Sequence, residues 1–161
     1  IYTFKFRTGI KISLKDIVLG KYLGAVSLIC LALTPTILYH ITISNLLESS
    51  SIWDIGNMIG SYIGLFFLIL AFASIGIFAS TISKSQMVTF ISSVIICFLV
   101  FYGFEIVSYF VQISSFEINT LGMKSHFDPI SRGVIDTRGL IYFCSVSVFF
   151  LILTIINLRK D

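Results

Sequence analysis

Residues 55–83 decide the fold of this chain. They read IGNMIGSYIGLFFLILAFASIGIFASTIS, and these 29 residues contain no Asp, Glu, Lys or Arg. An α-helix rises about 1.5 Å per residue and the hydrocarbon core of a bilayer is about 30 Å thick, so about 20 apolar residues span it. The stretch is therefore long enough to cross a membrane as one helix.

Three more stretches without charge accompany it along the chain. They are residues 22–47, 85–104 and 139–158, which are 26, 20 and 20 residues long. Of the 161 residues, 57% are apolar and 12% are charged, whereas soluble domains average about 25% charged residues. Four such helices would leave almost no chain to bury them in a soluble protein. The sequence therefore predicts an all-α polytopic membrane protein, and it excludes a soluble domain and a disordered chain.

We expect a single transmembrane domain over residues 1–161. Its four spans are placed at approximately 18–47, 55–83, 86–111 and 139–158. Residues 1–17 form a basic flank, either an amphipathic helix at the membrane interface or a solvated segment that only fixes orientation. Residues 112–138 form an outer loop, in which short interfacial or re-entrant helices are expected because long connections without structure of their own are unusual.

Lys and Arg divide unevenly between the two sides of the membrane that alternating spans define. Eight lie on the side that holds both chain ends and Lys84, and three lie on the other side, namely Lys124, Arg132 and Arg138. Short loops rich in Lys and Arg stay in the cytoplasm. We therefore expect both ends of the chain to be cytoplasmic. The net charge is only +3, and no basic run suggests a nucleic-acid partner.

Glycines recur at a spacing of four residues. Gly20 and Gly24 form one such pair, and Gly56, Gly60 and Gly64 form a run of three. Lipid supplies no hydrophobic drive for helix association, so small residues mark the faces where backbones approach closely. These five glycines are predicted helix-packing positions, against either a helix of this chain or a second copy.

No residue pattern indicates catalysis, a metal site or a cofactor. The three cysteines lie in three different spans without metal-ligand spacing, and His126 with Asp128 is too small a set for a metal. Lys21 follows Gly20, but the other glycine and the hydroxyl residue of a phosphate loop are missing. We expect no cofactor in this chain and no nucleotide hydrolysis by it.

Three segments resemble the permease subunits of ABC-2-type transporters. They are DIVLGKYLG at 16–24, the region from GSYIGLFFL at 60–68 to SKSQ at 83–86, and HFDPISRGVID at 126–136. Together they are most similar to the gliding-motility-associated permease, the GldF type, from about residue 13 onward. Residues 6–12, FRTGIKI, depart from the coupling run of the family, and Gly139 stands where an acidic residue is usual.

The resemblance implies a non-catalytic permease of an ATP-driven exporter in the bacterial cytoplasmic (inner) membrane. Family members usually have six spans, so the four spans here would be spans three to six of a chain whose first two are missing. Its partners would be an ABC ATPase subunit that binds the ATP, a second permease copy or related membrane subunit, and the lipid bilayer. The alternatives are a permease of another ABC-2 exporter (drug, ion or copper-site maturation type) and a non-transporting membrane scaffold.

The resemblance also singles out two groups of residues. The ATPase-coupling flank would contain Lys11, Lys15, Asp16 and Lys21. The outer-loop motif would contain His126, Ser131, Arg132, Gly133 and Asp136.

Overall fold

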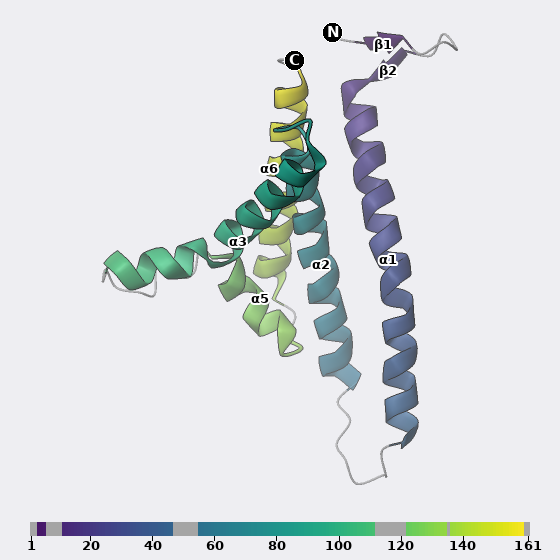
Figure 1. Ribbon diagram of the computed structural model, residues 1–161. Coiled ribbons are helices and arrows are strands. Elements are labelled where there is room, and N and C mark those ends of the chain that lie inside the picture. Colours follow the sequence, from purple (N-terminus) through teal and green to yellow (C-terminus); the bar gives the residue numbers. More distant parts are fainter. Residues whose placement is uncertain (1–2, 6–10, 47–54, 112–121, 135, 160–161) are drawn as a thin grey trace.

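The computed structural model describes residues 3–5, 11–46, 55–111, 122–134 and 136–159 (Figure 1). Its elements are β1 (Thr3–Lys5), β2 (Lys11–Ser13), α1 (Leu14–Leu46), α2 (Ile55–Ala79), α3 (Gln86–Val111), α5 (Met123–Ser131) and α6 (Thr137–Leu158). Within the described residues, four helices are long and apolar enough to cross a membrane, namely α1, α2, α3 and α6. The predicted all-α, multi-pass membrane fold is confirmed, and so is a short helix in the last connection.

Helix boundaries lie within two residues of the predicted spans except at two places. Helix α1 begins at Leu14, four residues before the predicted start. The second span was expected to continue to residue 83, but α2 ends at Ala79. The backbone N–H groups of Thr81 and Ile82 bond to carbonyls three residues back, which turns the chain away from the helix axis. Residues 47–54, and residues 112–121 of the expected outer loop, lie outside the described part of the chain.

Of the two interpretations of residues 1–17, a continuous interfacial helix is wrong for the described residues 3–5 and 11–13, which form strands. Strands β1 and β2 pair in antiparallel orientation, with Thr3 opposite Ser13 and Lys5 opposite Lys11. Of this flank, only residues 14–17 are helical among those described. Lys11 therefore lies on a strand and not on the same helix face as Lys15.

A capping box fixes the start of α1. The backbone N–H of Ser13 donates to Oδ2 of Asp16 at 3.1 Å, and the N–H of Lys15 donates to Oγ of Ser13 at 3.4 Å. Both bonds satisfy donors that the first helical turn leaves free. A serine three residues before an acidic residue, ahead of an apolar run, is the sequence signal for this start.

Helix α2 is the centre of the bundle and contacts α1, α3, α5 and α6 (Figure 1). Its buried face consists almost entirely of small residues: Gly60, Gly64, Ala71, Ser74, Ile75 and Ala79. Helix α6 lies beside it with a buried face of Gly139, Phe143, Ser147, Phe150 and Thr154. Small residues on α2 let the phenylalanines of α6 approach, and Ala71 and Phe143 belong to one buried cluster. Near the other end of the two helices, the rings of Phe78 and Phe150 lie 5.6 Å apart between centroids.

Hydroxyl and amide groups tie the helices together within this apolar bundle. Nδ2 of Asn157 donates to the carbonyl O and to Oγ1 of Thr81, at 3.2 and 3.0 Å, which joins the ends of α6 and α2. The Tyr22 hydroxyl on α1 donates to the carbonyl of Leu70 on α2 at 3.2 Å. Such bonds stabilise membrane bundles by about 0.6 kcal/mol each.

The outer two helices of the bundle are less covered than α2 and α6. Figure 1 shows α3 diverging from α2 and α6, and its large side chains are mostly exposed. Helix α1 also exposes large apolar residues, among them Leu31 at 74%. In a soluble protein these surfaces would drive aggregation, whereas in a bilayer lipid chains cover them.

Candidate functional site

The candidate site is built around α5, which is inserted among the spans rather than lying on top of them. At one end of α5, Gly133 contacts Gly60 of α2. At its other end, Met123 belongs to the same buried cluster as Ala71 of α2. These contacts are three turns of α2 apart, or about 16 Å. Helix α5 therefore descends from the end of the bundle opposite the chain termini toward the middle of α2 (Figure 1).

Glycines make this close approach possible. A Cβ at Gly60 would lie 2.7 Å from Cα of Gly133, and a Cβ at Gly64 would overlap the side chain of Ile130. Both predicted packing glycines thus contact the turn and the end of α5, not another span. Gly20 and Gly24 differ from them, because a Cβ there would meet no atom within 4 Å among the described residues. Within the described residues, these two glycines therefore make no tight contact.

Gly56, the fifth predicted packing glycine, is exposed. Gly76 also has room for a Cβ, since no atom lies within 4 Å of that position in the described structure. The regular spacing of glycines along α2 therefore does not mark one continuous contact. Only the middle of that series meets α5, and alanine and serine continue the buried face toward Ala79.

The outer-loop motif contains a helix stop followed by a helix start. The N–H of Gly133 donates to the carbonyl of Ile130 at 2.9 Å, and the N–H of Val134 donates to that of Pro129 at 3.1 Å. This pair of bonds is a Schellman motif, and Gly133 has the positive φ of 80° that it requires. Asp136 then caps α6 by accepting the N–H of Arg138 at 2.9 Å.

The remaining motif residues hold α5 to its neighbours or face outward. The His126 ring stacks on Tyr142 of α6, with ring centroids 4.5 Å apart. The carbonyl of Ser131 accepts the Ser61 hydroxyl of α2 at 2.9 Å. Arg132 is the C-cap residue and is exposed. These arrangements give His126 and Ser131 structural contacts to the adjoining spans.

Close packing between α6 and α5 explains the glycine at position 139. A Cβ at this position would lie 2.9 Å from Cδ1 of Ile130 and 3.1 Å from the carbonyl oxygen of His126. An acidic side chain would need still more space than this Cβ. Glycine is therefore the residue that fits the observed contact between α6 and α5.

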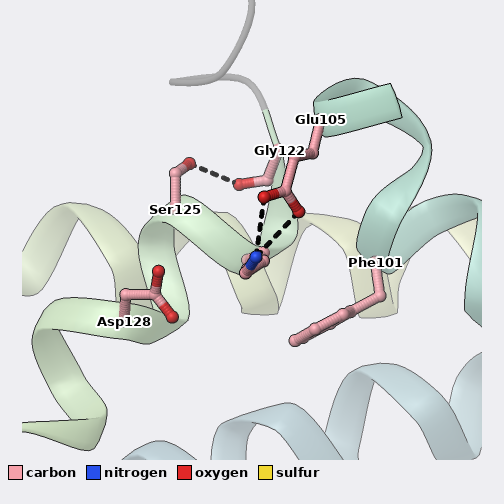
Figure 2. A pocket seen from close by; sticks show the side chains of 6 residues that line it. Phe101, Glu105, Gly122, Ser125 and Asp128 are labelled. Atoms are coloured by element: carbon pink, nitrogen blue, oxygen red, sulfur yellow. Dashed lines mark hydrogen bonds and ion pairs between the residues drawn. The ribbon is translucent and has the colours of Figure 1, made fainter. Parts of the chain in front are cut away.

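An ion pair at the start of α5 was missed by the sequence analysis. Nζ of Lys124 donates to both carboxylate oxygens of Glu105, at 2.7 and 2.8 Å (Figure 2). The charge-free stretch ends just before Glu105, and α3 continues through it to Val111, as the predicted span 86–111 does. Nζ of Lys124 also lies 5.5 Å from the ring centroid of Tyr102. An acidic residue inside a span, with a lysine in the next segment, was the available signal.

A cleft of about 180 Å³ surrounds this ion pair, lined by Phe101, Glu105, Gly122, Lys124, Ser125 and Asp128. Figure 2 shows Glu105 and Phe101 of α3 and Asp128 of α5 pointing toward the same space. The hydrogen bonds to Glu105 raise the pKa of Lys124 above its ordinary 10.5; partial burial opposes this, and the charge of Asp128 adds to it. Lys124 therefore stays charged, and two carboxylates and one ammonium leave a formal charge of −1.

The predicted ATPase-coupling flank lies at the other end of the bundle. Lys15, Asp16 and Lys21 are exposed on the first two turns of α1, and Lys11 is on β2. The capping box gives Asp16 a structural role as well. The flank is thus a charged surface at the end that holds both chain termini (Figure 1).

Metal binding has no support in the described residues. Within them, no group of three or more His, Cys, Asp or Glu side chains lies close enough to hold a metal ion. The candidate sites among the described residues are therefore the charged cleft and the charged flank.

Comparison of this chain with protein-family models, curated proteins and solved structures found no match.

Proposed function

We propose that this chain is the membrane-spanning permease subunit of an ATP-driven ABC-2-type transporter, an exporter of the gliding-motility-associated type. It has no catalytic centre, and a separate ABC ATPase hydrolyses the ATP. The chain lies in the bacterial cytoplasmic membrane beside a second permease copy or related subunit. Both chain ends and Lys84 face the cytoplasm, and α5 enters from the outer side.

The observation that carries this proposal is the position of α5. A short helix that descends between α2, α3 and α6 places irregular backbone and an ion pair at membrane depth. Such backbone is tolerated there only where protein or a water-filled cavity covers it. A membrane scaffold has no need of this arrangement, whereas a transport pathway needs polar groups inside the bundle.

The start of α1 supports a coupling role for the charged flank. The capping box holds Lys15 and Asp16 on a defined first turn, and Lys21 follows about one and a half turns later. Helix α1 contains Pro35, where one backbone hydrogen bond is lost, and the 21 residues before the proline form an uninterrupted lever of about 32 Å. The Tyr22 hydroxyl then joins this lever to α2. A force on the flank is thereby transmitted to the helix that carries α5.

The test is reconstitution of the full chain with the ATPase encoded beside its gene. We expect the chain to stimulate ATP hydrolysis, and Lys15→Glu to lower the stimulation about fivefold at low salt. Lys84→Glu is the matched control, since it makes the same charge change in the other cytoplasmic connection. High salt should weaken the wild-type stimulation, because exposed charge pairs are screened.

Each alternative gives a different result in this experiment. A change of membrane orientation in Lys15→Glu, seen by cysteine labelling, would show that the lysine only sets topology. Equal stimulation by Lys15→Glu, Lys84→Glu and wild type would remove the coupling role of the flank. A chain that neither binds nor stimulates the ATPase is not its permease subunit.

A further inference from the structure

An apolar groove between α2 and α3 leads into the charged cleft. The groove has a volume of about 440 Å³, and its lining includes Leu68, Phe72, Val94, Cys97, Phe98 and Phe101. Phe101 also lines the cleft around Glu105 and Lys124, so the two spaces adjoin. Because α3 diverges from α2, the groove is open to the surrounding lipid, with Val94 and Phe98 exposed at 52% and 54%.

The charges in the cleft favour one kind of headgroup. Lys124 donates to both oxygens of Glu105, which neutralises that pair. The carboxylate of Asp128 lines the same cleft, and within the described residues it forms no hydrogen bond or ion pair of its own. A cation would find a carboxylate there, whereas an anion would have to break the Lys124–Glu105 pair and lie beside Asp128.

We propose that the groove and the cleft form one binding site for a membrane amphiphile that carries an alkyl chain and an ammonium headgroup. The alkyl chain lies in the groove between α2 and α3, and the ammonium group binds Asp128. The claim that such an amphiphile is exported rests on the proposed function. The claim that the chain binds it does not.

The test measures binding without any ATPase. Phe98→Trp is introduced into a Trp53→Phe chain in nanodiscs, so that the only indole lies in the groove. Brominated dodecylammonium, dodecyl sulfate and dodecanol are titrated as quenchers of its fluorescence. We expect saturable quenching by the ammonium compound at a concentration about tenfold lower than for the other two, the advantage of one charge-assisted hydrogen bond.

Two matched pairs of variants separate the headgroup from the chain. Asp128→Asn should remove the tenfold ammonium preference, while Asp16→Asn, the same change at the other end of the bundle, should keep it. Cys97→Phe should fill the groove and weaken all three quenchers, while Cys144→Phe, at an exposed position on α6, should not. Far-UV circular dichroism of each variant confirms that it is folded.

Several outcomes overturn the proposal. Equal affinity for the three amphiphiles would mean that ordinary bilayer chains fill the groove, and tighter binding of the sulfate would reverse the charge assignment. If each nanodisc holds two copies of the chain and no amphiphile quenches the fluorescence, the groove is covered by the second copy. If the chain stimulates its ATPase but shows no ammonium preference, the proposed function stands and this binding site is refuted. If it binds ammonium amphiphiles but does not stimulate the ATPase, the binding site stands and the proposed function is refuted.

Discussion

Replacing Gly60 with alanine should separate α2 from the turn that follows α5. The new Cβ would lie 2.7 Å from Cα and 2.8 Å from the carbonyl oxygen of Gly133. Both are backbone atoms of the Schellman motif, so no change of side-chain rotamer relieves the overlap. The turn or the helix must move, and the contact that holds α5 at membrane depth loosens.

The size of the effect follows from two opposing contributions. Adding a methyl group to a closely packed contact costs about 1–3 kcal/mol, and a clash with backbone belongs at the upper end. Alanine gains up to about 1 kcal/mol over glycine in a helix interior. We therefore expect Gly60→Ala to lower the free energy of unfolding by about 2 kcal/mol. Gly64→Ala should cost a similar amount, because its Cβ would overlap the Cγ2 branch of Ile130, a stiff side chain that is fully buried.

Gly76→Ala is the matched control on the same helix. No atom lies within 4 Å of its Cβ position in the described structure, so only the gain in helix propensity remains. The unfolding free energy is measured by titration with SDS in mixed micelles, followed by far-UV circular dichroism. Equal unfolding free energies for Gly60→Ala and Gly76→Ala would refute the close approach of Gly60 to Gly133.

Further predictions concern charges and the helix start. Lys124→Met should let α3 move away from α5, since the Glu105 carboxylate loses its partner; an unchanged spin-label distance between these helices would contradict this. Pairing with Glu105 raises the pKa of Lys124 above 10.5 in the folded chain. The ion pair therefore contributes fully to stability below pH 10.5, and this contribution is lost as the pH rises through the folded-state pKa. SDS titrations at a series of pH values measure the loss. Cysteine at position 84 should be labelled only from the cytoplasm and cysteine at position 124 only from outside; labelling of position 84 in intact cells would reverse the topology. Ser13→Ala should destabilise the start of α1 by about 1 kcal/mol and speed hydrogen exchange at Lys15, whereas unchanged exchange would exclude the cap.

The number and placement of the spanning helices were predictable because lipid constrains the backbone so strongly. The hydrocarbon region holds no water, so a spanning segment must hydrogen-bond its own N–H and C=O groups to one another. An α-helix achieves this for any apolar sequence of sufficient length. The charge-free stretch 55–83 therefore predicted α2 to within a few residues of Ala79. Its final residues failed to be helical because local three-residue bonds replaced the helical ones.

Contacts between helices were not predictable to the same degree. Gly20 and Gly24 have the same spacing as Gly60 and Gly64, but only the second pair meets a neighbour in the described structure. Spacing shows that a face is flat, and it does not show what covers that face. The partner of Gly60 is a glycine in a turn more than 70 residues later, and nothing local to Gly60 indicates it.

The ion pair of the cleft was missed for a related reason. The third span was predicted over residues 86–111, which include Glu105, but no partner was assigned to its carboxylate. The structure supplies the counter-charge from Lys124, 19 residues further along the chain. Whether a helix keeps a charge thus depends on a second segment, which hydropathy alone does not reveal.

The pairing of α2 with α6 also determines when the bundle can assemble during synthesis. The ribosome adds roughly 60 residues after α2 before α6 begins, which takes about 3–12 s at 5–20 residues per second. During this interval α2 must stay in the bilayer without its main neighbour. It can do so because its one buried hydroxyl, on Ser74, donates to the carbonyl of Ala71 in the same helix at 2.6 Å. The chain is thus suited to insertion one helix at a time, with the last helix closing the bundle.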